Sequence, residues 1–126
     1  MELIIGGAFQ GKLEYARTLY PETKWIDGEN CSSEELQKAS GINHFELYIK
    51  RRLKETGDVS DLAPSLIEKN PNIIIISQEV GYGVVPIDAF DRQYRETVGR
   101  VCTELAAFSD KVHRVVCGVG MVIKSD

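Results

Sequence analysis

Cysteines are scarce in this chain, and the three that it has lie far apart. Cys31, Cys102 and Cys117 form no C-x-x-C pair and have no matching histidine pattern. An odd number of cysteines at such spacing argues against a disulfide framework and against a structural zinc site. We therefore expect three free thiols, buried as small apolar side chains.

The sequence also lacks an excess of positive charge and a long apolar segment. Its formal net charge is -4, whereas proteins that follow a nucleic-acid backbone usually present a basic surface. The one basic cluster, Lys50-Arg51-Arg52, is more typical of the solvated face of a helix than of a phosphate clamp. No apolar run approaches the length that spans a bilayer, and no basic segment precedes the first apolar run. We expect a cytoplasmic protein with no nucleic-acid or membrane partner.

What the sequence does have is enough apolar residues for one core. With 126 residues, 43% of them hydrophobic, the chain predicts a single domain spanning residues 1–126. Hydrophobic patterns predict strands at 2–5, 24–27, 73–77, 112–117 and 121–123, and helices at 12–19, 32–39, 44–55, 61–69 and 88–108. Gly41 is expected to end one helix and Asn43 to cap the next. The alternation of strands and helices predicts an α/β fold.

A glycine-rich turn follows the first expected strand. Residues 6–12, Gly-Gly-Ala-Phe-Gln-Gly-Lys, have the spacing G-x-x-x-x-G-K. Glycines in this pattern let backbone amides turn toward phosphate oxygens, and the lysine reaches the β- and γ-phosphates. Leu13 stands where the motif normally has a serine or threonine hydroxyl for magnesium. We expect a phosphate cradle with weakened metal chemistry; the alternative is a strand-to-helix turn without a ligand.

A second feature is the stretch from Ile73 to Pro86, IIIISQEVGYGVVP. Four isoleucines without alternation suit a strand buried on both faces. Glu79 follows that strand, and ligands of open α/β sheets bind at the carboxyl edge of the strands. If the first strand is parallel to this one, Glu79 and the glycine-rich turn lie at the same edge. Amides, a lysine and a carboxylate together indicate a nucleotide site.

Three further polar residues have two interpretations each. Asp27 precedes Gly28 and either makes the turn or meets a ribose or a metal. His44 lies in the first turn of an expected helix and either caps it, facing solvent, or is catalytic. Arg92 lies near the start of the long C-terminal helix and either faces the site or forms an ion pair on its own helix. The apolar stripe of that helix is expected to be core or interface.

Several segments resemble one enzyme family. SQEVGYGVVP, DRQYRETVGR and AAFSDKVHRVVCGVGMVIK, between residues 74 and 124, are similar to the C-terminal part of the adenosylcobinamide kinase / adenosylcobinamide-phosphate guanylyltransferase family. The opening GGAFQGK resembles that family's GGARSGKS. The most specific part is EVGYGVVP. The resemblance implies a P-loop, RecA-like, mostly parallel sheet flanked by helices, and a role in assembling the nucleotide loop of cobalamin.

The resemblance also implies substrates and residue roles. Family members phosphorylate adenosylcobinamide with a nucleoside triphosphate and then transfer GMP from GTP to that phosphate through a guanylylated histidine. GTP or ATP, Mg²⁺ and a corrinoid are therefore the expected cofactors and partners. By position, the glycines and Lys12 would hold the triphosphate, Glu79 would act near the γ-phosphate or its metal, and Arg92 would match a helix arginine. The full nucleotide-binding set is Gly6, Gly7, Ala8, Phe9, Gln10, Gly11, Lys12, Leu13 and Arg92.

The chain departs from the family pattern at Leu13, at Gln78, and in a shorter middle without the HRxxRP-like segment that carries the family's histidine. His44 is a candidate nucleophile only if the entrance of its helix lies over the glycine-rich turn. His113, within a strand, is interpreted as structural. Three hypotheses follow. The first is a guanylyltransferase, with or without kinase activity, in which Glu79, Lys12 and His44 are catalytic. The others are a nucleotide-binding protein without catalysis and an interaction subunit that uses the long helix. A homo-oligomer is expected.

Overall fold

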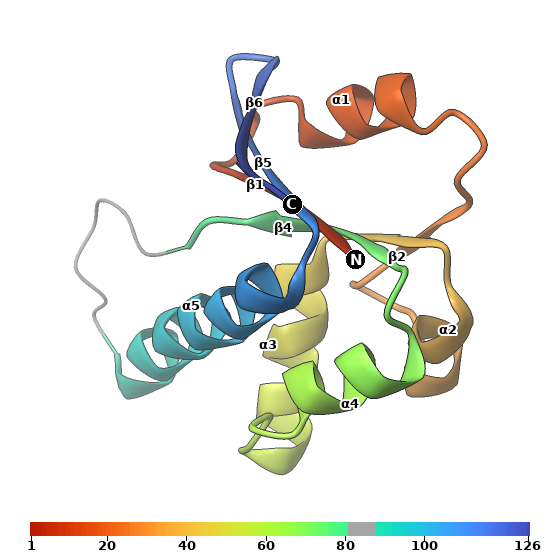
Figure 1. Cartoon of the computed structure of the whole chain (residues 1–126). Helices are drawn as coiled ribbons and strands as arrows, with labels where there is room; N and C mark the ends of the chain where they lie inside the picture. Colours follow the sequence, from red (N-terminus) through yellow and green to blue (C-terminus); the bar gives the residue numbers. More distant parts are fainter. Residues whose placement is uncertain (81–87) are drawn as a thin grey trace.

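A computed structural model describes residues 1–80 and 88–126 of the chain (Figure 1). Along the described residues the elements are β1 (Glu2–Gly6), α1 (Lys12–Leu19), β2 (Trp25–Asp27), α2 (Ser33–Lys38), β3 (Gly41–Asn43), α3 (Phe45–Thr56), α4 (Leu62–Lys69), β4 (Ile74–Gln78), α5 (Ala89–Phe108), β5 (Lys111–Val116) and β6 (Val119–Ser125). The predicted α/β class is confirmed. The mostly parallel sheet flanked by helices is consistent with a P-loop-like fold.

The strands form one sheet in the order β2-β3-β4-β1-β5-β6. All neighbouring pairs are parallel except β5 with β6, which is antiparallel. The first strand lies between β4 and β5, and its last residue, Gly6, is in register with Gln78 of β4. The glycine-rich turn and Glu79 therefore leave the sheet side by side at one edge, as the sequence predicts.

The two faces of the sheet are covered unequally. Helix α1 lies over one face, and α2 to α5 lie over the other (Figure 1). Ile73 and Ile75 belong to the large core beneath α2 to α5, whereas Ile76 packs with Ile4 and Ala16 beneath α1. The isoleucine strand is thus buried on both faces, as expected.

The apolar stripe of α5 belongs to the core. Tyr94, Val98, Val101 and Leu105 are buried, and the helix packs against α3 and α4. Phe108, at its last turn, is half exposed. Most of this stripe is therefore covered within the chain, which leaves little of it for a partner.

Three sequence predictions need correction. Gly41 begins β3 instead of ending a helix; a side chain there would meet the Trp25 ring 2.6 Å away, so the glycine is needed for packing between strands. His44, not Asn43, is the N-cap residue of α3. All three cysteines are free, but only Cys31 is fully buried. Cys102 is partly buried, and Cys117 is exposed because it lies in the turn between β5 and β6.

Part of the segment EVGYGVVP, residues 81–86, lies outside the described residues. Within the described part of the chain, no helix has both the length and the apolar character needed to cross a membrane.

Candidate functional site

The glycine-rich turn reverses the chain between β1 and α1. Phe9 and Gly11 both have left-handed backbones, with φ of 58° and 82°, and Gly11 is the N-cap residue of α1. Within the turn, Lys12 Nζ donates a hydrogen bond to the Gly7 carbonyl at 2.7 Å. The side chain of Lys12 thus reaches back across the loop. A cation in this position can bind an anion that is held by the same loop.

The turn between β5 and β6 holds the glycine-rich turn from outside. The Cys117 amide donates to Gln10 Oε1 at 2.5 Å, and the Gly118 amide donates to the Gln10 carbonyl at 2.8 Å. Gln10 is therefore anchored through both its backbone and its side chain. This contact between distant segments fixes the loop without a ligand.

A cleft of about 850 Å³ opens beside the glycine-rich turn. Its lining combines the turn with the start of α3 and the end of β4, and consists of Ala8, Phe9, Gln10, Gly11, Lys12, Leu13, Glu14, Arg17, Asn43, His44, Glu46, Leu47 and Gln78. The entrance of α3 thus faces the turn, which is the condition set above for His44. Gly6 and Gly7 are not among these lining residues; their carbonyls accept hydrogen bonds from the Glu79 amide and from Lys12 Nζ.

His44 is oriented by a carboxylate. Its Nδ1 lies 3.2 Å from each carboxylate oxygen of Asp27, and both side chains are partly exposed. When Nδ1–H donates to Asp27, Nε2 keeps its lone pair, which is the arrangement of an oriented base or nucleophile. Asp27 Oδ1 also accepts a hydrogen bond from the Glu29 amide at 2.8 Å. Asp27 therefore stabilises the turn after β2 and also holds the His44 ring.

Glu46 is a cleft residue that the sequence did not single out. Only 4% of it is exposed, and its Oε1 accepts a hydrogen bond from the Gln78 amide at 2.9 Å. The position of Glu46 depends on β3. Because α3 follows this strand directly, the first turn of α3 lies at the carboxyl edge of the sheet. The available signal in the sequence was an acidic residue in the first turn of an expected helix. That signal indicates a site only when β3 is known to place this turn at the carboxyl edge of the sheet.

The pKa of Lys12 reflects this setting. Partial burial lowers the pKa of the ammonium below its ordinary value, while the negative charges of Glu46 and Glu79 act in the opposite direction. A cation that has lost part of its hydration gains more from an anionic ligand than a surface lysine does. The two carboxylates oppose this gain, because they also repel the anion.

Glu79 lies next to the cleft. Its amide donates to the Gly6 carbonyl at 2.8 Å, and its carboxylate faces Arg114, with Nε and Nη2 each 3.4 Å from a carboxylate oxygen. It lines an adjoining cavity of about 360 Å³, which shares Glu46, Leu47 and Gln78 with the cleft. Arg92, by contrast, is exposed on α5 and is absent from the described lining of the cleft.

The carboxylates beside the cleft are the side chains to compare with the ligands that Mg²⁺ requires. No group of three or more His, Cys, Asp or Glu side chains that could hold a metal occurs among residues 1–80 and 88–126. Magnesium is often bound by one or two carboxylates together with substrate phosphates, and Glu46 and Glu79 are the carboxylates whose charges act on Lys12. Leu13 supplies no oxygen; it lines the cleft and packs against the small core beneath α1.

Fold and site together define an α/β protein with a glycine-rich turn, a lysine and two carboxylates at the carboxyl edge of a mostly parallel sheet. Residues 30–123, well over half of the chain, match the model of the cobinamide kinase / cobinamide phosphate guanyltransferase family. The chain belongs to this family, as the resemblance of its C-terminal segments predicts. The matched range begins after the glycine-rich turn.

Two curated relatives carry the same description, bifunctional adenosylcobalamin biosynthesis protein CobU. The chain is similar to the protein of Salmonella typhimurium, with 42% identity over 52 residues, and to that of Escherichia coli, with 40% identity over 52 residues. Each match covers 41% of this chain and 29% of the relative. The matched part is thus less than a third of either relative's length.

Proposed function

We propose that this protein acts in adenosylcobalamin biosynthesis, where it binds GTP at the cleft and transfers the guanylyl group to adenosylcobinamide phosphate. The observation that carries the proposal is the lining of the cleft, which joins the glycine-rich turn and Lys12 to a histidine held by a carboxylate. Family membership supplies the substrate class.

Each residue of the cleft has a definite task in this proposal. The amides of the turn and Lys12 bind the triphosphate. Asp27 holds His44 so that Nε2 faces the α-phosphorus, and attack forms the N–P bond while the bond to the β-phosphate oxygen breaks and pyrophosphate leaves. The phosphate of the corrinoid then attacks the same phosphorus, which returns the lone pair to Nε2. Mg²⁺ would supply charge neutralisation on the phosphates.

Kinase activity is a second part of the same proposal. Lys12 reaches toward β- and γ-phosphates in a loop of this spacing, and Glu79 lies in the adjoining cavity at the end of β4. Transfer of the γ-phosphoryl group of ATP or GTP to the hydroxyl of adenosylcobinamide would use this side of the site.

A second candidate function is nucleotide binding without catalysis. Leu13 favours it, because an apolar side chain packed on the core replaces the hydroxyl that binds magnesium. In this case the cleft retains a phosphate cradle, and the protein acts through its bound nucleotide alone.

Labelling distinguishes the two candidates. Purified protein is incubated with Mg²⁺ and GTP labelled at the α-phosphate, and the chain is examined for acid-labile label. The guanylyltransferase predicts label on the wild-type chain and none on His44→Ala. If GTP raises the melting temperature but no label forms, the non-catalytic candidate is correct.

The chain provides its own controls, because it has only two histidines. His113→Asn is expected to keep the label if it melts cooperatively, since His113 is buried away from the cleft between Tyr15 and Glu2. Asp27→Asn should slow labelling and leave the thermal shift with GTP intact. Label that persists in His44→Ala would contradict the assignment of the nucleophile, and no thermal shift with GTP or ATP would contradict both candidates.

A further inference from the structure

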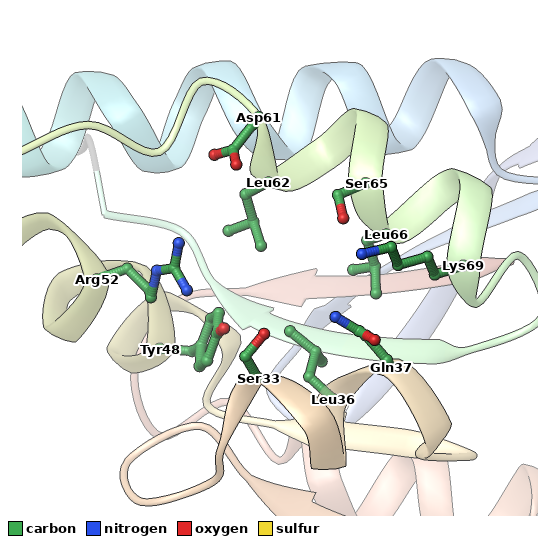
Figure 2. A pocket seen from close by; sticks show the side chains of 10 residues that line it. All are labelled: Ser33, Leu36, Gln37, Tyr48, Arg52, Asp61, Leu62, Ser65, Leu66 and Lys69. Atoms are coloured by element: carbon green, nitrogen blue, oxygen red, sulfur yellow. The ribbon is translucent and has the colours of Figure 1, made fainter. Parts of the chain in front are cut away.

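A second, smaller pocket lies away from the cleft, between α2, α3 and α4 (Figure 2). Its volume is about 160 Å³, and its lining consists of Ser33, Leu36, Gln37, Tyr48, Arg52, Asp61, Leu62, Ser65, Leu66 and Lys69. None of these residues lines the cleft. A ligand here would therefore occupy a site separate from the proposed nucleotide site.

Arg52 is the unusual residue of this pocket. Its Nε is shielded from solvent and has no acceptor among the described residues. Arg52 as a whole is partly exposed, but a donor atom that is shielded from solvent normally has an acceptor, because an unpaired donor loses its hydration without compensation. The guanidinium thus gains a hydrogen bond if it turns toward an oxyanion in the pocket.

The rest of the lining suits an anion with an apolar part. Lys69 adds a second cation, and Ser33 and Ser65 add hydroxyl donors (Figure 2). Leucines from two of the helices, Leu36, Leu62 and Leu66, line the remaining wall. Asp61, also in the lining, is negative and disfavours a doubly charged ligand.

We propose that this pocket binds a small aliphatic carboxylate, whose acidic group pairs with Arg52 and whose hydrocarbon part packs against the leucines. The planar fork of arginine matches a carboxylate through two parallel hydrogen bonds. A cavity of this size holds a molecule of about six non-hydrogen atoms, which is the size of butyrate. The single negative charge of a carboxylate fits two cations and one acid better than a phosphate dianion does.

The test is a titration of the whole chain with sodium butyrate, followed residue by residue through amide ¹H–¹⁵N spectra. Saturable shifts are expected at the lining residues of α2, α3 and α4. The neutral isostere 1-butanol and equal ionic strength of sodium chloride should not reproduce them. Inorganic phosphate should shift the glycine-rich turn instead, and stronger binding of phosphate than of butyrate in this pocket would overturn the carboxylate assignment.

Variants provide the decisive comparison. Arg52→Gln should weaken butyrate binding by about tenfold or more, because it removes a charged hydrogen-bond donor. Lys54→Gln removes a charge of the same sign two residues away on α3, where Lys54 lies over the Phe90 ring, and should change the Kd by less than about twofold. Equal loss in both variants would show that only net charge matters and would overturn the site.

Asp61→Asn keeps the inference testable if Arg52→Gln does not fold. Asp61 makes no side-chain capping hydrogen bond at the start of α4, so the amide should leave the helix intact. Removal of its charge should tighten butyrate binding by about threefold. No saturable shift in the wild-type chain, or unchanged affinity in Asp61→Asn, would contradict the proposal.

Discussion

Leu13 is the residue that favours the non-catalytic candidate function. Replacing it with serine restores a hydroxyl at the position that binds magnesium in G-x-x-x-x-G-K-[ST] loops. We expect Leu13→Ser to strengthen the dependence of GTP affinity on Mg²⁺, so that the ratio of the Kd in EDTA to the Kd in Mg²⁺ rises about tenfold above the wild-type ratio. Isothermal titration with and without the metal measures this ratio.

The matched control for that substitution is Leu13→Ala. Leu13 is partly buried against the core beneath α1, so both variants should lose about 1–2 kcal/mol of unfolding free energy. Only the serine variant has the hydroxyl. Equal Mg²⁺ dependence in the two variants would mean that position 13 does not face the metal, and the reason for favouring the non-catalytic candidate would disappear.

Among single residues, the sequence predicted those site positions that belong to a motif of fixed local spacing. The loop from Ala8 to Leu13 was singled out by its glycines, and the structure places it along the cleft with His44. Glu46 was missed because its place depends on β3, a strand of three residues whose partners come from distant parts of the chain. Arg92 was proposed from its place near the start of the long helix and from the family pattern; it is exposed on α5, and its role stays a prediction.

Among the elements, the hairpin of β5 and β6 is the one that couples the sheet to the glycine-rich turn. Tyr15 of α1 packs so closely on this hairpin that a Cβ at Gly120 would lie 2.0 Å from its ring. The ring cannot easily move aside, because Tyr15 Oη forms a 2.8 Å hydrogen bond with Nδ1 of the buried His113. The position of α1, and with it Lys12, therefore depends on a glycine far along the chain.

We predict that Gly120→Ala lowers the free energy of unfolding by about 1–3 kcal/mol, the usual cost of overpacking. Urea denaturation followed by circular dichroism measures the change. GTP affinity should fall as well, since the start of α1 carries Lys12.

Gly99→Ala is the paired control for this prediction. Gly99 lies within α5, and a Cβ there meets nothing within 4 Å, so alanine should stabilise the chain by about 0.5–1 kcal/mol through helix propensity. Similar effects of the two substitutions would show that the contact between Tyr15 and the hairpin is unimportant.

Most elements could be predicted from periodicity, and the exceptions have a common cause. Helix α5 and the isoleucine strand have long, clear patterns, and both were predicted close to their observed bounds. The strand β3 has three residues, and β6 extends beyond its predicted apolar centre at 121–123 to Val119–Ser125. Short or edge strands depend on pairing with their neighbours more than on their own residues, so local patterns do not define them.

For the whole molecule, the class of fold followed from the alternation of strands and helices, but the order of strands did not. That order places β6 at an edge of the sheet, where among the described residues it pairs only with β5. Charged residues often protect such edges from association. Here Val119, Met121, Val122 and Ile123 are instead 50–65% exposed. Among the described residues, β6 has four of the eight large apolar side chains that are exposed, while most of the α5 stripe is buried.

We therefore predict that two copies of the chain associate through β6. Sedimentation velocity over a range of concentrations should show a dimer, and Ile123→Lys should shift it toward monomer, because a charge on an edge strand opposes pairing. Phe108→Lys tests the alternative interface on α5, since Phe108 is the half-exposed end of that stripe, and it should leave the dimer intact. A wild-type chain that is monomeric at every concentration, or a dimer that only Phe108→Lys dissociates, would exclude β6 as the interface.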